Sequence, residues 1–281
     1  MSTKETSASA RRRRFNIGHF IGLIFVSFVC LFPFYWMVTS SLKHQQDILS
    51  PTPKFFFEPT LEHYRGAIAK FDVAASLANS LIVALTTTAL SLIVGTPAAY
   101  ALARFEFKAK RDIWFWFITN RMISPIVLAL PFFILARNLK ILDTQLALIL
   151  IYLTFNVPIV VWICSDQFRN IPKDLDEAAT LEGYSTFSIF WRVGIPLAAP
   201  GIAVSAIFSF IFSWNELLYA LVLTRSRAQT APVVATSFMS GYELPWGQIM
   251  ATGTMIVLPV IIFSIIVSRQ MVSGLTMGAV K

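Results

Sequence analysis

The chain has 281 residues, of which 56% are hydrophobic and 14% charged, and its formal net charge is +8. A soluble globular domain is typically about 25% charged, so this composition excludes a soluble fold and indicates an integral membrane protein. The length allows about six helical spans of roughly 20 residues each, which predicts one all-α membrane domain. Basic loops that set membrane topology explain the positive charge, so we expect membrane lipid and no nucleic acid as a partner.

The N-terminal residues 1–16 have few apolar side chains and close on Arg11–Arg14, so we predict a disordered basic tail. The first span is predicted from about Ile17 to Val38. No small-residue cleavage site follows it, so it is interpreted as a retained span and not as a signal peptide. The transmembrane domain is predicted to cover 17–269, and a C-terminal tail covers 270–281.

Five further apolar segments are predicted to cross the membrane. They lie at about 80–102, 113–136, 145–163, 202–223 and 249–267. Between the first two spans, apolar residues from Leu61 to Phe71 recur at helical spacing behind a Thr60 cap, which predicts a short amphipathic helix at the membrane surface. Lys and Arg are concentrated in the segments that lie inside when the N-terminus is inside, so both termini are predicted to be cytoplasmic.

The segment 172–196 is the one long stretch that cannot span a membrane. Pro172 and three acidic residues, among them Glu177, favour the start of a helix. Gly183 allows a bend, and Pro196 is expected to end the second helix because its ring blocks the preceding turn. The prediction is a helix, a bend and a second helix outside the hydrocarbon.

The spacing of this segment resembles the EAA signature of the membrane subunits of ATP-binding-cassette importers. The matching residues are Glu177, Ala178, Ala179, Gly183, Val193, Gly194, Ile195 and Pro196. Val193 and Ile195 stand where the family usually has Ile and Leu, which is a conservative departure. The resemblance implies a type I importer permease fold in which these residues, Gly194 apart, couple the permease to an ATPase subunit. An ordinary cytoplasmic helical loop is the alternative interpretation.

Further stretches resemble carbohydrate importers of the maltose-permease type. They are Tyr100–Arg104, Leu142–Thr144, Ser213–Glu216 and the tail Gly274–Lys281. The resemblance implies a bacterial inner-membrane protein that forms a heterodimer with a second permease subunit, binds two copies of an ATPase subunit, and receives sugar from a periplasmic binding protein. It also implies an ATPase-contacting tail through Gly274, Thr276, Gly278 and Lys281, for which a frayed terminus is the alternative.

Enzyme chemistry is not expected in this chain. No stretch matches the phosphate-binding loop G-x-x-x-x-G-K-[ST], and no His, Cys, Asp or Glu residues have metal-ligand spacing. The chain is therefore predicted to bind no cofactor or metal itself, and ATP and Mg are expected on the partner ATPase subunits.

Polar and aromatic residues within the spans are the candidates for a substrate path. They are Asn120, Arg121, Trp214, Asn215, Glu216 and Tyr219. Arg121 is predicted to lie about 12 Å along its helix, where a charge needs a partner or water, and this suggests an anionic sugar such as a sulfonated one.

Three alternatives stay open. Arg121 and Glu216 could form an internal ion pair, and the aromatic residues could simply pack against helices. An ion-gradient-driven secondary transporter would also carry buried charges, but it should show inverted repeats with broken helices in matched positions.

Overall fold

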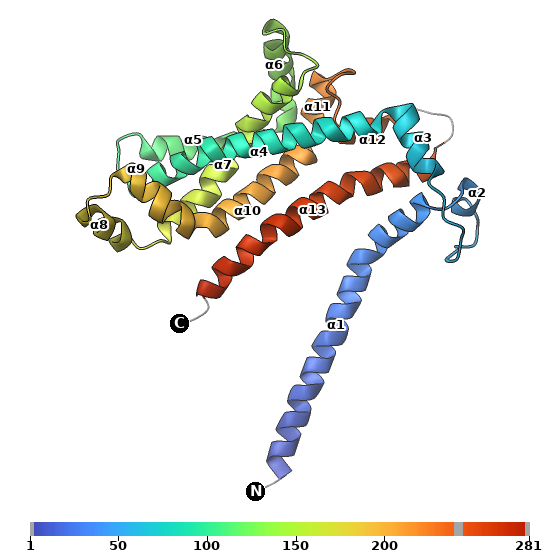
Figure 1. Cartoon of the computed structure of the whole chain (residues 1–281), viewed down its shortest axis with the longest axis horizontal. Helices are drawn as coiled ribbons and strands as arrows, with labels where there is room; N and C mark the ends of the chain where they lie inside the picture. The colour runs from blue at the N-terminus through green and yellow to red at the C-terminus, as the bar shows by residue number, and fades with distance from the viewer. Residues whose placement is uncertain (1–2, 239–243, 279–281) are drawn as a thin grey trace. The chain divides into compact units, whose positions relative to one another are not determined.

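The computed structural model describes residues 3–238 and 244–278, with side chains for 18–120, 122–238 and 244–267. This part of the chain is helical and contains no strand, as the sequence predicted (Figure 1). The elements are α1 Thr3–Ser41, α2 Gln45–Ile48, α3 Glu62–Phe71, α4 Val73–Arg104, α5 Lys110–Met122, α6 Pro125–Asn138, α7 Gln145–Arg169, α8 Asp174–Leu181, α9 Thr186–Ile189, the π-helical turn η1 Phe190–Gly194, α10 Ile195–Trp214, α11 Leu218–Leu223, α12 Ala231–Ser237 and α13 Trp246–Gly278.

The helices divide into two compact units. Unit 1 comprises Met1–Lys70 and Gly241–Met255, and unit 2 comprises Phe71–Ser240 and Ile256–Lys281. Helix α13 contributes to both, and the candidate site described below lies wholly in unit 2.

Five helices are long and apolar enough to cross a membrane, and a sixth span is present if one bent pair is counted as a single span. The predicted third span is that pair, because α5 and α6 meet at an angle of 98°. The bend falls at Ile123 and Ser124, just before Pro125. A proline has no N–H to donate and disfavours a helical conformation in the residue before it, so the helix ends and restarts there. The predicted third span over 113–136 is thus a broken span, with its break at the polar and proline positions inside it.

The predicted end of a helix at Pro196 is wrong. The segment Thr186–Trp214 forms one continuous span through α9, η1 and α10. The π-helical turn changes the hydrogen-bond register just before the proline, which then occupies the first turn of α10, where a missing N–H is tolerated. The predicted fifth span is also interrupted near its other end, since α10 stops at Trp214 and α11 begins at Leu218.

Helix α1 begins at Thr3, within the predicted N-terminal tail, and disorder of that tail stays a prediction. Residues 1–16 contain neither Gly nor Pro, and helix propagation from an established span adds one hydrogen bond for each residue fixed. At the other end, α13 continues to Gly278 through most of the predicted C-terminal tail. The predicted amphipathic helix is present as α3, and the Thr60 hydroxyl accepts a hydrogen bond from the Glu62 N–H.

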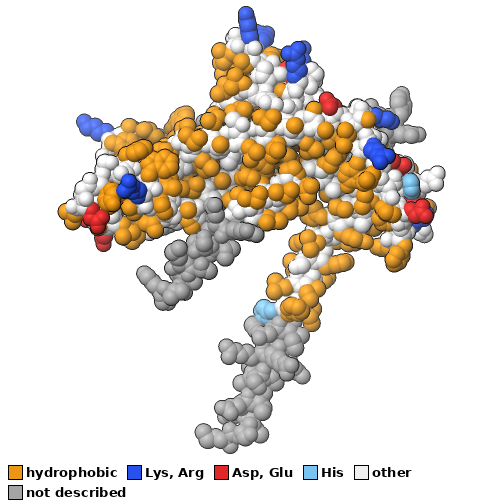
Figure 2. Space-filling model, in the orientation of Figure 1, with side chains coloured by type: hydrophobic (Ala, Val, Ile, Leu, Met, Phe, Trp, Pro, Cys, Tyr) orange, Lys and Arg blue, Asp and Glu red, His pale blue; other side chains and the backbone are white. Residues whose placement is uncertain are grey.

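Unit 2 is organised around α4, α7 and α10, which pack along one another. Small residues allow close approach: a side chain on Gly95 would collide with Val160 of α7. One apolar cluster joins α4, α7, η1 and α10 near α8, and another joins α4, α6, α7, α11 and α12 toward the opposite end. Figure 2 shows hydrophobic side chains over much of the visible surface of this unit, with acidic side chains near α8. Such apolar flanks suit contact with lipid.

Candidate functional site

The site has two parts, a surface segment built from α8 and α9 and a cavity within the helices of unit 2. The surface segment begins with Asp174, Asp176 and Glu177 in the first turn of α8, where the helix dipole favours negative charge. In α8 only Ala179 is buried, while Glu177 and Ala178 are exposed. Two large apolar side chains also face outward: Leu181 is 90% exposed and Phe187 is 72% exposed. The segment thus presents an acidic and apolar surface.

The bend after α8 is a Schellman turn centred on Gly183. The Gly183 N–H donates to the Thr180 carbonyl at 3.0 Å, and the Tyr184 N–H donates to the Ala179 carbonyl at 3.1 Å. Gly183 has a φ of +86°, a left-handed conformation that glycine adopts without steric cost. Ser185 then caps α9 by accepting a hydrogen bond from the Ser188 N–H. The predicted bend at Gly183 is therefore present.

Arg104, the last residue of α4, holds α8 against the membrane domain. Its Nε lies 2.7 Å from the Asp176 carboxylate, an ion pair whose alignment falls outside hydrogen-bond geometry. Its Nη1 donates to the Ile171 carbonyl at 2.9 Å, just before α8 begins. The Arg104 side chain is 6% exposed and that of Asp176 is 20% exposed. One guanidinium thus fixes both the chain entering α8 and the helix itself.

Three aromatic side chains, those of Tyr100, Phe168 and Phe190, form a socket against which the chain packs where it leaves the surface segment. The Tyr100 ring centroid lies 5.2 Å from that of Phe168 and 5.1 Å from that of Phe190. Gly194 packs so closely on Tyr100 that an added Cβ would lie 3.3 Å from that ring. Ile195 packs against the same cluster, Val193 is half-buried and Pro196 is exposed. Movement of this segment would therefore be passed on to α4, α7 and α10.

The second part of the site is a cavity of about 720 Å³. It is lined by Asn120 near the end of α5, the start of α6, Thr154 and Phe155 of α7, and the break between α10 and α11. Four of the predicted path residues line it: Asn120, Asn215, Glu216 and Tyr219. The structure thus gathers residues from positions almost 100 apart in the sequence around one space. Amide groups and an aromatic ring in such a cavity suit a polar solute with apolar faces.

Glu216 is held by three hydrogen bonds. Its carboxylate accepts from the Tyr152 hydroxyl at 2.9 Å, from the Tyr219 N–H at 2.9 Å and from the Ala220 N–H at 3.1 Å. The last two donors are orphan N–H groups in the first turn of α11, so Glu216 caps that helix across the break. Both carboxylate oxygens are therefore engaged without Arg121, whose side chain lies outside the described residues.

Trp214 is placed away from the cavity. Its side chain is 1% exposed, stacks on Phe210 at 5.6 Å between ring centroids, and donates from Nε1 to the Ile256 carbonyl at 3.2 Å. This packing leaves no ring face for a sugar. Of the predicted tail residues, Lys281 and the side chains of Gly274–Gly278 also lie outside the described part of the chain.

The structure adds two residues, Arg104 and Asp143, that the sequence does not single out as functional. Both lie within the resembling stretches Tyr100–Arg104 and Leu142–Thr144, but the sequence predicts no site role for either residue. Asp143 lies between α6 and α7, and its carboxylate accepts from four consecutive backbone N–H groups, those of Arg225–Ala228, at 2.9–3.3 Å. Burial raises the Asp143 pKa, but the four donors outweigh it and hold the pKa at about 2.

The described residues contain no group of three or more metal-ligating side chains.

Comparison with known proteins decides the family. Residues 91–275 match the family described as binding-protein-dependent transport system inner membrane component. The chain belongs to this family. The matched region includes the surface segment and the cavity-lining residues of this inner membrane component.

Two relatives are similar to this chain in sequence, and one solved structure is similar to it in fold. The chain is 39% identical to the trehalose transport system permease protein SugB of Mycobacterium tuberculosis, over 89% of this chain and 92% of the relative. It is 34% identical to the sulfoquinovosyl glycerol transport system permease protein SmoH of Agrobacterium fabrum, over 89% of each chain. A bacterial ABC transporter that imports the acidic polysaccharide alginate has the same fold, with a TM-score of 0.71 at 23% identity over 92% of this chain and 96% of that one. The component is therefore a multi-pass inner-membrane protein with the fold of ABC importer permeases.

Proposed function

We propose that this chain is the permease subunit of an ATP-binding-cassette importer for a sugar or sugar derivative. The observation that carries the proposal is the exposed α8–α9 segment, clamped to α4 and bearing the EAA spacing, in a chain of the binding-protein-dependent family. Full-length relatives named as permeases for trehalose and for sulfoquinovosyl glycerol support a carbohydrate as the cargo.

The proposed assembly contains a second permease subunit, two ATPase subunits that bind ATP and Mg, and a periplasmic sugar-binding protein. Both termini and α8 face the cytoplasm in this proposal. The exposed Leu181 and Phe187 side chains then enter a cleft on the ATPase, and the Glu177 carboxylate pairs with a basic residue there. Residues 270–281 form the cytoplasmic tail, and Gly274, Thr276, Gly278 and Lys281 contact the ATPase dimer. ATP hydrolysis belongs to the partner, so this subunit is not itself an enzyme.

The mechanism follows from the contacts of the surface segment. Closure of the ATPase dimer moves α8, and the Arg104–Asp176 ion pair passes this displacement to the end of α4. The socket of Tyr100, Phe168 and Phe190 passes it to α7 and α10. The same three helices form the framework of unit 2, so their rearrangement opens the cavity to one side of the membrane or the other.

We propose the 720 Å³ cavity as part of the solute path. Asn120 and Asn215 offer amide hydrogen bonds, and Tyr219 offers a ring face. Glu216 holds the backbone between α10 and α11 in place through its hydrogen bonds to the first turn of α11. An anionic sugar would need a basic side chain in the path. Among the described lining residues, Glu216 is the one acidic residue and none is basic. Arg121 is the candidate for the basic side chain. Competition of uptake by uncharged and sulfonated sugars decides between the two cargo types.

The coupling role is tested by charge reversal at Glu177. Glu177→Lys is expected to lower ATP-dependent sugar uptake more than tenfold in reconstituted vesicles, because a cation replaces the anion at the proposed contact. The subunit should still insert in the membrane, since Glu177 is exposed. Glu182→Lys is the matched control, because Glu182 is an exposed carboxylate in the same segment outside the EAA spacing. Equal uptake by the two variants, or uptake without any ATPase subunit, contradicts the proposal.

A further inference from the structure

Unit 1 contains a cavity of about 290 Å³ that the proposed transport function does not use. It lies between the end of α1, the loop that follows it, and the start of α13. Two tryptophans, Trp36 and Trp246, line it together with Lys43. Its other polar lining residues are Ser40, Asp47, Ser50 and Lys54.

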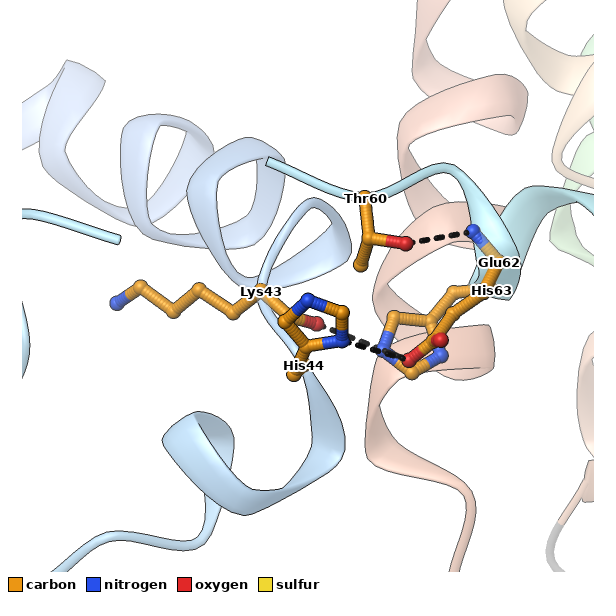
Figure 3. Close-up of polar contacts among 5 residues, drawn as sticks. All are labelled: Lys43, His44, Thr60, Glu62 and His63. Carbon is orange, nitrogen blue, oxygen red and sulfur yellow. Dashed lines mark hydrogen bonds and ion pairs between the residues drawn. The ribbon is translucent and has the colours of Figure 1, made fainter. Parts of the chain in front are cut away.

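Lys43 is a buried basic residue that forms no ion pair with any other described residue. The residue is 3% exposed, and its Nζ lies 4.6 Å from the Trp36 ring centroid and 5.2 Å from that of Phe57. Aromatic faces attract a cation but do not neutralise it. Among the described residues of unit 1, ion pairs join Lys54 to Asp47 and Glu62 to two histidines, and none includes Lys43. Figure 3 shows the Lys43 side chain extending away from Glu62.

The backbone that carries Lys43 is fixed in place. The His63 Nε2 lies 2.7 Å from the Lys43 carbonyl oxygen (Figure 3). The Thr60 N–H donates to the Leu42 carbonyl at 2.8 Å. The His63 ring packs against Gly247, where any side chain would collide with it. These contacts tie the loop after α1 to α3 and α13, so the lysine is positioned before any ligand arrives.

The cavity lies where the apolar parts of two helices, α1 and α13, end and begin. The apolar part of α1 ends at Ser41, two residues before Lys43, and the apolar part of α13 begins at Trp246. Tryptophans are enriched at the level of lipid headgroups. In the same loop, Phe56 is 98% exposed and Phe55 is 59% exposed, which suits insertion among lipids. The site is therefore at headgroup depth.

We propose that this cavity binds the phosphate group of a phospholipid, with Lys43 as its counter-ion. Lys54 and Asp47 neutralise each other, so the described lining residues carry one net positive charge, which a phosphodiester matches. The Trp36 and Trp246 rings flank the glycerol region, and the acyl chains run along the exposed apolar surface of α1. This assignment does not depend on which solute the protein transports.

The test uses the full chain purified in detergent, with native mass spectrometry to count bound ligand. Three probes are titrated: phosphatidylglycerol, diacylglycerol with the same acyl chains, and inorganic phosphate. Lys43→Met keeps the unbranched chain between the aromatic rings but removes the charge. We expect phosphatidylglycerol to bind the unaltered chain and to bind Lys43→Met about five- to tenfold more weakly. Diacylglycerol and inorganic phosphate should bind neither chain well.

Two variants check the interpretation. Lys43→Arg should restore binding because it restores the charge, and Lys70→Gln, an exposed lysine of unit 1 outside the cavity, should bind as the unaltered chain does. Equal binding of phosphatidylglycerol to Lys43→Met overturns the proposal, and so does inorganic phosphate binding as tightly as the lipid. A loss of affinity for a solute-binding protein in Lys43→Met with unchanged lipid binding would assign the cavity to a protein partner and also overturn it.

Discussion

The two ends of α4 are held in different ways. At one end, the Arg104 side chain ties α4 to the surface helix α8 through an ion pair and to the chain that enters it through one hydrogen bond. At the other end, the Asn79 side chain donates to the Arg227 and Gln229 carbonyls at 3.0 Å, and the Ser80 hydroxyl accepts from the Ala231 N–H at 2.8 Å.

Asp143 adds further hydrogen bonds to the loop held at this second end, which therefore satisfies its backbone groups within the chain. The α8 end instead leaves Leu181 and Phe187 in solvent. An exposed apolar surface of this kind indicates a place completed by another protein. The comparison teaches that the α8 end of α4 depends on one ion pair for its contact with the surface helix, while the other end is held by several hydrogen bonds to one loop.

The largest effect is expected from breaking the Arg104–Asp176 ion pair. Arg104→Gln leaves the Asp176 carboxylate without its counter-charge and should destabilise the attachment of α8 by about 3 kcal/mol, the lower end for a broken buried pair because Asp176 is 20% exposed. Limited proteolysis within residues 172–196 measures the loosening, and uptake in reconstituted vesicles should fall with it.

A nearby exposed ion pair provides the control. Lys110→Gln breaks the pair with Glu106, whose side chain is 84% exposed, and should cost less than about 0.5 kcal/mol. Equal proteolysis of the two variants would show that Arg104 does not clamp α8.

A smaller effect is expected at the other end from titration of Asp143. Its pKa is lowered from 3.8 to about 2, so its stabilisation of the loop is fully present above about pH 4 and is lost as the pH falls through 2. The check is hydrogen exchange of the Arg225–Ala228 amides, corrected for intrinsic exchange rates. Protection should be roughly tenfold lower at pH 2 than at pH 5, a factor already reduced to allow for solvent screening of the carboxylate. Asp143→Asn should lower the protection at pH 5 and remove its pH dependence. Identical protection at both pH values in the unaltered chain would refute the role.

The smallest effect is expected at the bend that follows α8. Gly183→Ala should cost about 1 kcal/mol, because alanine is strained at a φ of +86° while its added Cβ meets nothing within 4 Å. Gly183→Asn should cost less, since asparagine tolerates the left-handed conformation. Thermal unfolding measures the order of stability of the unaltered chain and the two variants. An alanine variant as stable as the asparagine variant would exclude backbone strain as the reason for glycine at this position.

Patterns local in the sequence predicted much of this protein. The apolar spans, the acidic start of α8 and the bend at Gly183 depend on residues within a few turns of one another, so composition and spacing revealed them. The continuation of the helix through Pro196 escaped prediction because it depends on a π-helical turn packed against Tyr100, far away in the chain.

The sequence by itself determined that this is a membrane protein, because hydropathy needs no tertiary contacts. It also predicted a surface segment whose spacing resembles the EAA signature. Only the tertiary structure decided what the polar residues do. Arg104 meets a carbonyl 67 positions away, and Glu216 meets a hydroxyl 64 positions away. Trp214 turns from the cavity into the packing against α13. Such partners are chosen by helix packing, and a side chain's type alone does not reveal which of several distant groups will satisfy it.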